Sequence, residues 1–293
     1  MRRDPSVKVG FALRSSVFHP SLIVRIAPLL ERAKVDSIWF PDAGMSFDAL
    51  DLCAVALGSS RRVRVGTGVI RAGEQDPERL STRVLTMSEA SEGRFILGVG
   101  AGQARGPAAI EEVVSLAEKL RAGYRGERKP PIFFAALRGG MLRAALSSAD
   151  GAILNFCPPS HVERILPKGG VRKGFALACY IKLFFAKSDA AAKKMLVQEM
   201  TNYNSYPSYH KMFEAAGVAD SIAGLGRDSH NIPDMLLEIS LPNPAKKEVA
   251  QLLGRFARAG VNLPIIYPYV SGDEDYQLEV VGTLASVAAA VAK

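Results

Sequence analysis

The chain alternates short apolar runs with amphipathic stretches from one end to the other, and this alternation restricts its fold more than any other feature. Eight apolar runs have the length and the residue types of strands, and helical patterns alternate with most of them. We expect the strands at residues 7–13, 37–40, 63–69, 95–99, 131–136, 152–156, 175–185 and 263–267. We expect the helices at residues 21–34, 47–57, 77–91, 107–122, 140–148, 190–216, 246–259 and 276–292. Continuously apolar strands are typical of a parallel sheet that is buried on both faces.

Eight strand-then-helix units indicate a closed (β/α)8 barrel, a fold that usually needs about 250 residues. A doubly wound open sheet is the alternative architecture. The turn after the first expected strand, Leu13-Arg14-Ser15-Ser16, lacks the glycines of a dinucleotide-binding turn, which argues against that alternative. We therefore predict one α/β domain over residues 1–293, a TIM barrel with a less regular insertion at 187–244.

Composition excludes several classes of protein. Hydrophobic residues make up 48% of the chain and charged residues 23%, which is typical of a globular protein and not of a disordered one. No apolar run approaches the roughly 18 residues of a membrane span, and no apolar segment of a secretory signal follows Met1. We expect a cytoplasmic protein without disulfides, because Cys53, Cys157 and Cys179 are far apart in the sequence.

The charge balance suggests the kind of partner. The formal net charge is +8, but the basic residues form short scattered groups and no long stripe interleaved with aromatic residues. This pattern favours an anionic small ligand or a solvated surface over nucleic acid. His19, His161, His210 and His230 lack the spacing of metal ligands, so no metal site is expected.

Ligands of a TIM barrel bind at the carboxyl ends of the strands, so the residues that follow each strand are the candidates for function. Asp42 follows the second strand, where a carboxylate can hydrogen-bond a cofactor ring or act as an acid or base, or can simply cap the next helix. Gly68 ends the third strand, and a glycine there indicates a bulge or tight packing. Gly100 and Gly102 end the fourth strand and could form a wall under a planar ligand.

The best candidate for anion binding is the segment Leu137-Arg138-Gly139-Gly140-Met141, which joins the fifth strand to a helix. Two glycines at a helix start expose backbone N–H groups, and the helix dipole adds partial positive charge. Arg138 supplies a forked donor that suits a phosphate. A plain tight turn is the alternative. Further along, Tyr203, Tyr206 and Tyr209 could pack on the barrel or roof a substrate pocket.

Several stretches together resemble the bacterial luciferase-like superfamily of flavin and deazaflavin enzymes. The resemblance rests on Val35–Asp42, Val65–Val69, Ser88–Gly102, Pro131–Leu137, Ala149–Asn155 and Ala259–Pro264. It implies a TIM barrel that binds F420 or FMN, with a non-proline cis peptide at Gly68–Val69 behind the ring and the phosphate chain at Gly139 and Gly140. It also implies a homodimer. The segment Gly66-Thr67-Gly68-Val69 is similar to the bulge of the methylenetetrahydromethanopterin reductases.

The chain also departs from the pattern of that superfamily. Ala12-Leu13 stand where the reductases have a strand-one carboxylate, Ala43 stands in place of a histidine, and Asp76-Pro77 replaces a His-Pro pair. Pterin reduction and sugar-phosphate oxidation are therefore not carried over to this chain. Only the cofactor scaffold is.

The sequence therefore predicts an F420-dependent oxidoreductase that transfers a hydride between a deazaflavin and a small organic substrate. An FMN-dependent luciferase-like monooxygenase is the alternative, and a non-catalytic ligand-binding barrel with an eroded site is a second one. We expect Asp42 to be the catalytic residue and to contact the cofactor. The other expected cofactor-binding residues are Thr67, Gly68, Val69, Gly100, Gly102, Ala136, Leu137, Arg138, Gly139, Gly140, Met141 and Asn155.

Overall fold

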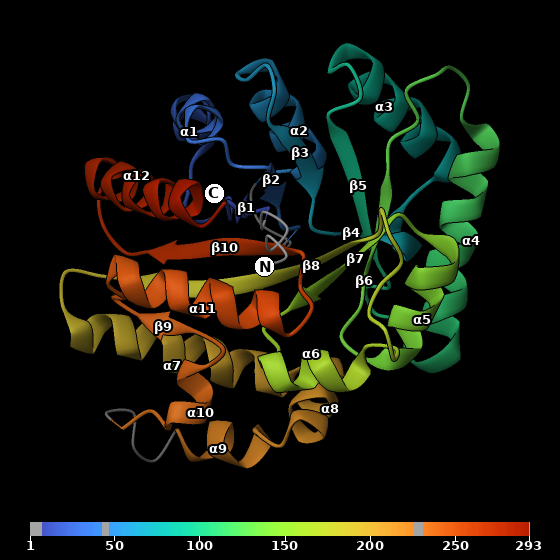
Figure 1. Ribbon diagram of the computed structural model, residues 1–293. Coiled ribbons are helices and arrows are strands. Elements are labelled where there is room, and N and C mark those ends of the chain that lie inside the picture. Colours follow the sequence, from blue (N-terminus) through green and yellow to red (C-terminus); the bar gives the residue numbers. More distant parts are fainter. Residues whose placement is uncertain (1–7, 43–46, 226–230, 293) are drawn as a thin grey trace, which may run out of the picture.

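Eight parallel strands close into a barrel in the part of the chain that the structure describes, residues 8–42, 47–225 and 231–292 (Figure 1). In this computed structural model the strands are β1 (Gly10–Ala12), β2 (Ser37–Phe40), β3 (Arg64–Thr67), β5 (Phe95–Gly100), β6 (Ile132–Ala135), β7 (Gly151–Asn155), β8 (Ala176–Phe185) and β10 (Leu263–Val270). They are adjacent in that order, and β10 pairs with both β8 and β1. The predicted TIM barrel is confirmed.

The helices lie outside the strands (Figure 1). They are α1 (Pro20–Arg32), α2 (Ala49–Gly58), α3 (Pro77–Ala90), α4 (Gly106–Gly123), α5 (Gly139–Ser148), α6 (Pro159–Ile165), α7 (Asp189–Ser205), α8 (Pro207–Ala216), α9 (Ala219–Gly224), α10 (Asp234–Leu237), α11 (Lys246–Arg258) and α12 (Glu274–Val291). A short 3₁₀ helix, η1, covers Ala72–Glu74. The short strands β4 (Ile70–Arg71) and β9 (Leu241–Pro242) pair with β5 and β8.

Local signals explain where two of the early helices begin. The Asp48 carboxylate accepts hydrogen bonds from the backbone of Leu50 at 2.8 Å and of Asp51 at 3.1 Å, so it caps α2. Asp76 caps α3 through Glu78 N at 2.9 Å, and Pro77 follows at a position where its missing N–H leaves no helical bond unmade. These carboxylates are conventional helix caps.

The barrel core is apolar and closely packed. Every residue of β2, β5 and β10 is buried, as expected for parallel strands between a filled interior and an outer layer of helices. Trp39 on β2 is completely buried, and its indole N–H donates to Ser37 Oγ at 2.9 Å. Gly66 on β3 leaves space for that ring, since a Cβ there would meet the indole at 2.9 Å.

The third strand is shorter than predicted. Instead of one strand over 63–69, β3 ends at Thr67 and β4 begins at Ile70. The peptide bond between Gly68 and Val69 is cis, as the resemblance implied. Gly68 and Val69 therefore interrupt the strand at the carboxyl end of the barrel.

The stretch predicted as a less regular insertion, 187–244, contains α7 to α10 and β9. The helical region expected over 190–216 consists of two helices, because α7 ends at Ser205 and α8 begins at Pro207. A proline lacks the N–H that continues a helix and clashes with the preceding turn.

Cys157 and Cys179 are buried and free, with their sulfur atoms 4.0 Å apart.

Among the described residues, no helix combines the length and the apolar character needed to cross a membrane. Ala43, where the superfamily often has a histidine, lies outside the described residues.

Substitution of Gly98 tests how closely β3 and β5 pack. A Cβ at Gly98 would overlap the backbone carbonyl oxygen of Thr67, whereas a Cβ at Gly282 on α12 would meet nothing within 4 Å. We expect Gly98→Ala to lower the free energy of unfolding by about 1–3 kcal/mol or more. We expect Gly282→Ala to be neutral or to stabilise by up to about 1 kcal/mol. Urea unfolding of the two variants checks this, and equal midpoints would contradict the described strand contact.

Candidate active site

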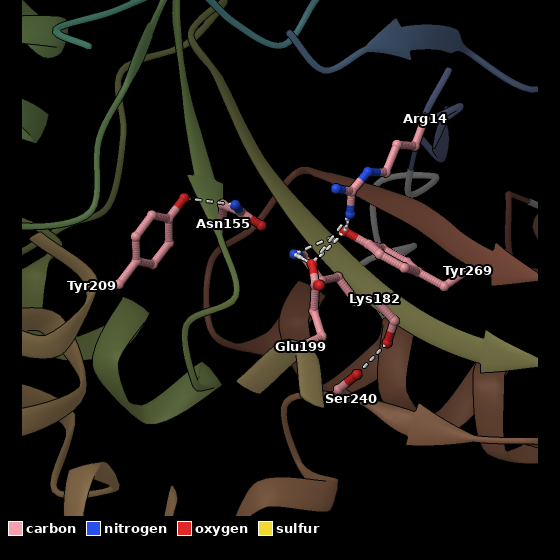
Figure 2. Close-up of polar contacts among 7 residues, drawn as sticks. All are labelled: Arg14, Asn155, Lys182, Glu199, Tyr209, Ser240 and Tyr269. Atoms are coloured by element: carbon pink, nitrogen blue, oxygen red, sulfur yellow. Dashed lines mark hydrogen bonds and ion pairs between the residues drawn. The ribbon is translucent and has the colours of Figure 1, made fainter. Parts of the chain in front are cut away.

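The carboxyl ends of the strands form the candidate site, which we call the mouth. Its polar side chains come from Arg14, Asn155, Lys182, Glu199 and Tyr269 (Figure 2). Strands β8 and β10 have ten and eight residues, against three in β1 and four in β3. They therefore extend past their neighbours and carry side chains over the end of the barrel.

Four of these side chains form a hydrogen-bonded group, the Lys182 network (Figure 2). Lys182 Nζ on β8 donates to Glu199 Oε1 on α7 at 2.7 Å and to Tyr269 Oη on β10 at 3.1 Å. Tyr269 Oη donates to the same Glu199 oxygen at 2.6 Å. Arg14, which follows β1, donates to Tyr269 Oη at 3.1 Å. The network thus links the segment after β1, strand β8, helix α7 and strand β10 through one carboxylate and one phenol.

Lys182 is completely buried, which is rare for a lysine unless the charge is compensated. Besides the Glu199 carboxylate, aromatic faces surround its ammonium group. The nitrogen lies 3.6 Å from the ring centroid of Tyr203 and 4.6 Å from that of Phe156. Attraction between a cation and these ring faces stabilises an ammonium group that water does not reach.

The network keeps Glu199 ionised. Burial by itself would raise the pKa of the Glu199 carboxyl, but the Lys182 charge and hydrogen bonds from Lys182 and Tyr269 outweigh it and hold the pKa below its usual value. Burial raises the pKa of the Tyr269 hydroxyl well above its usual range, so this group stays protonated and donates to Glu199. The Lys182 network therefore presents the charged groups of Arg14, Lys182 and Glu199 and the phenol of Tyr269.

Asn155 and Arg14 each bring a buried polar atom that is unused within the described part of the chain. Asn155 Nδ2 donates to Tyr209 Oη at 2.7 Å, but Asn155 Oδ1 has no partner among the described residues. Arg14 Nε also has no partner there. Because buried polar groups are normally hydrogen-bonded, these two atoms suit a polar ligand in the mouth.

The predicted aromatic stripe is split by the helix break. Tyr203 and Tyr209 stack edge-to-face with ring centroids 4.5 Å apart, and both pack against the buried core. Tyr206, at the junction of α7 and α8, is 49% exposed. Two of the three tyrosines therefore cover the mouth, and the third faces solvent.

The structure places Gly68 at the mouth but does not leave the space above it open. A Cβ on Gly68 would overlap the Tyr180 hydroxyl, which donates to the Gly68 carbonyl oxygen at 3.2 Å. Tyr180 comes from the extended strand β8, so aromatic side chains fill the region where we expected room for a planar ring. Sequence reasoning missed Tyr180 because it lies in the middle of an apolar strand.

Three other expected residues, Thr67, Val69 and Gly100, make close contacts around β3 and β5. The Thr67 hydroxyl is buried and fully used, since it donates to Gly98 O at 3.0 Å and accepts from Gly98 N at 2.9 Å. Its side chain is therefore a strand-to-strand link and not a ligand contact. Val69 lies against Gly100, where a Cβ would meet Val69 Cγ2 at 2.6 Å.

The remaining predicted residues lie around the same end of the barrel. Asp42 lies two residues after the end of β2, and its charge contributes to the raised pKa of Arg71, after the larger effect of the hydrogen bond from Arg71 to Glu74. Gly102 has a φ of +55°, which favours glycine, and it packs against Arg71. Ala136 is completely buried, so it offers no side-chain surface to a ligand.

The anion-binding candidate forms the start of α5, as predicted. Arg138 is the residue before the helix, and among the described residues its side chain makes no capping hydrogen bond. The N–H groups of Gly139, Gly140 and Met141 begin the helix and have no partner within it. Leu137, the residue before Arg138, has its carbonyl oxygen 3.0 Å from His161 Nε2. Burial lowers the pKa of His161, an effect that this backbone contact partly offsets, so that imidazole is neutral.

Sequence reasoning also missed Lys182 and Glu199. One signal for Lys182 was present: in the run Ala176–Phe185 it is the lone charged residue, on the same strand face as Tyr180 and Phe184. No local signal pointed to Glu199, since its partner lies on another element.

Comparison with known proteins agrees with the barrel fold. Residues 6–113 match the luciferase-like monooxygenase family. A 5,10-methylenetetrahydromethanopterin reductase from Archaeoglobus fulgidus is 21% identical over 306 aligned positions, covering 87% of this chain and 91% of that protein. The F420-dependent tetrahydromethanopterin reductase of Methanopyrus kandleri shares the fold, with a TM-score of 0.71, 16% identity and coverage of 96% and 97% of the two chains. The match to the family covers residues 6–113, and the likeness to the solved structure shows the fold.

A second relative matches a shorter part of the chain. The F420-dependent glucose-6-phosphate dehydrogenase of Amycolatopsis mediterranei is 31% identical over 113 residues. That match covers 36% of this chain and spans about a third of the dehydrogenase, 34% of its length. Both relatives are oxidoreductases by name.

The buried ion pair between Lys182 and Glu199 leads to a prediction about stability. Glu199→Gln leaves the Lys182 charge buried without its carboxylate, so we expect a loss of about 3–5 kcal/mol in the free energy of unfolding at neutral pH. The pKa of Glu199 is lowered in the folded protein, so its contribution is present above the unfolded-state pKa and is lost as the pH falls through the folded-state pKa. The difference between wild type and variant should therefore shrink in acid.

Denaturant unfolding at neutral and acidic pH measures that difference. Glu214→Gln is the matched control, because Glu214 is exposed and its carboxylate lies 3.4 Å from His210 on the protein surface. We expect this control to change stability by less than about 1 kcal/mol at either pH. A Glu199→Gln variant as stable as the control would show that the ion pair contributes nothing.

Proposed function

We propose that this chain is an F420-dependent oxidoreductase that transfers a hydride between the deazaflavin and a small organic substrate at the mouth of its barrel. The likeness to two F420-dependent relatives supports the cofactor class. The single observation that carries the proposal is the pair of buried atoms without partners among the described residues, Arg14 Nε and Asn155 Oδ1. They sit at the carboxyl ends of β1 and β7, where barrel enzymes bind their ligands.

The residues of the mouth fit such a cofactor. Arg14 Nε can donate to, and Asn155 Oδ1 can accept from, the polar edge of a ring. The uncapped start of α5 at Gly139 and Gly140 would hold a phosphate through backbone N–H groups. Asp42, Gly68 and Val69 remain proposed contacts of the ring, and a ring against Gly68 requires the Tyr180 hydroxyl to move aside.

The chain itself would supply orientation and electrostatics, while the bound deazaflavin would donate or accept the hydride. Arg14 is the more exposed cation of the Lys182 network, at 21% of its side chain, and it can bind a substrate oxygen on which negative charge develops. Tyr269 holds a proton next to that guanidinium. Lys182 touches no solvent and fixes the Glu199 carboxylate, so its role is to position the network.

The aromatic side chains would keep water from the reacting atoms. Tyr180, Tyr267 and Phe156 are each at most 3% exposed. In such an environment the fixed charges of Arg14 and Glu199 act more strongly than they would in water.

A cofactor titration tests the proposal. We expect F420 to bind more tightly than FMN, followed by absorbance of the ring, and Gly140→Asp to weaken binding at least tenfold by placing a negative charge against the phosphate. Gly140→Ala is the control, since its Cβ would make only an ordinary contact of 3.6 Å with Ile110. Preference for FMN would instead favour a luciferase-like monooxygenase, and binding without turnover would favour a non-catalytic barrel. Equal affinity of the Asp and Ala variants would discard the phosphate site.

The role of Arg14 has its own test. We expect Arg14→Ala to lower kcat by about 10²–10³-fold, the usual cost of losing a donor to a developing charge, and guanidinium in the buffer to restore part of the rate. The assay follows F420 absorbance with a panel of alcohols, sugar phosphates and reduced pterins. Arg25→Ala, which removes an exposed arginine paired with Glu274 at 3.6 Å, should leave kcat unchanged. Unchanged turnover by Arg14→Ala would remove Arg14 from the mechanism.

The homodimer and the cytoplasmic location expected from the sequence also remain predictions.

A further inference from the structure

The opposite end of the barrel contains a cavity that the proposed function does not use. It has a volume of about 720 Å³ and lies where the strands begin, between the starts of β3, β6, β7, β8 and β10. Its lining includes Arg64, the first residue of β3, Pro131, which precedes β6, and Ala176, the first residue of β8. The mouth residues lie at the other ends of these strands, so the two sites are separated by the packed barrel interior.

The walls of this cavity, which we call the basal cavity, carry an excess of positive charge. Lys8, Arg64, Arg121 and Lys129 line it. Two carboxylates pair with part of this charge: Asp150, which lies 3.1 Å from Arg121, and Asp36, which pairs with Arg64 and lies 3.8 Å from Lys8. Four cations against two carboxylates leave two positive charges in excess. A cleft of one charge sign with apolar walls concentrates ligands of the opposite sign.

The floor of the basal cavity is apolar. Phe133, Phe175 and Leu263 line it and are each at most 2% exposed. Only small parts of these side chains face the cavity, beside the more exposed Pro131 and Ala176, and the arginines and lysines stand around them. The cavity therefore combines apolar and charged groups, which can bind the two parts of an amphipathic anion.

Tyr124 supplies an independent sign of a missing partner. It lines the basal cavity at the end of α4 and is 4% exposed, yet its hydroxyl makes no hydrogen bond to any residue that the structure describes. Burial raises the pKa of this hydroxyl well above its usual range, so it remains an O–H donor. A buried donor without an acceptor costs stability unless a ligand or water accepts from it.

We propose that the basal cavity binds a small organic phosphate whose body is aromatic or otherwise flat and apolar. The phosphate would accept from Tyr124 Oη and interact with Arg121 and its neighbouring cations, and the body would lie on Phe133 and Phe175. The proposal is independent of the cofactor at the mouth.

Isothermal titration of the full chain with 1-naphthyl phosphate tests the proposal. We expect wild type to bind it, and Tyr124→Phe to weaken binding about three- to tenfold, since only one hydrogen bond is lost. Thermal stability of Tyr124→Phe should not fall, because the hydroxyl makes no bond within the described chain. Arg121→Gln should weaken binding at least tenfold through loss of a charged donor. Lys119→Gln is the matched control: it removes the same charge from the same helix at an exposed position outside the cavity.

A phosphate could also bind at the start of α5, and Gly140→Asp separates the two sites. We expect that variant to bind 1-naphthyl phosphate at the basal cavity as wild type does, whatever happens to F420. Absence of binding by wild type overturns the proposal. Binding that Gly140→Asp abolishes, or that Tyr124→Phe and Arg121→Gln leave unchanged, also overturns it. Failure of the F420 titration has no bearing on these results.

Discussion

The pairing of β8 with β10 is the interaction on which both ends of this barrel depend. The two strands run in register from Ala178 with Leu263 to Phe185 with Val270, and this ladder closes the sheet. The same pairing continues past the ends of shorter strands such as β1. Tyr180 pairs with Asn155 at the end of β7, and Lys182 lies two residues further along β8 on the same strand face, so the extra length of β8 carries Lys182 to the mouth.

A buried charge then organises what the extended strands bring together. The Lys182 ammonium cannot reach water, so it needs Glu199 from α7 and the faces of nearby tyrosines. This requirement ties the 187–244 segment to the barrel and sets which side of α7 faces the mouth. Buried ion pairs are weak sources of net stability, and their value here is the defined position that they impose on Arg14 and Tyr269.

The two ends of the barrel offer different chemistry. The mouth combines phenols, an amide, a carboxylate and two cations, and its aromatic side chains leave little exposed surface. The basal cavity has a volume of about 720 Å³, with apolar side chains at its floor and basic residues around it. In barrels the amino-terminal end usually serves stability. The Tyr124 hydroxyl is buried without a partner in the described chain, and a role in stability does not explain it. In this respect the basal cavity differs from an end of the barrel that serves stability.

Sequence patterns by themselves determined the barrel, its strands and the general position of the mouth. Apolar runs, the caps at Asp48 and Asp76, and the glycines at 68, 139 and 140 are local features, and each acts within a few residues. Only the tertiary structure decided which polar side chains meet. Arg14 and Tyr269 are 255 residues apart, and Lys182 and Glu199 lie on different elements. Such contacts depend on strand order, strand length and the way the ring closes. Side-chain periodicity records which face a residue occupies but not what lies opposite it.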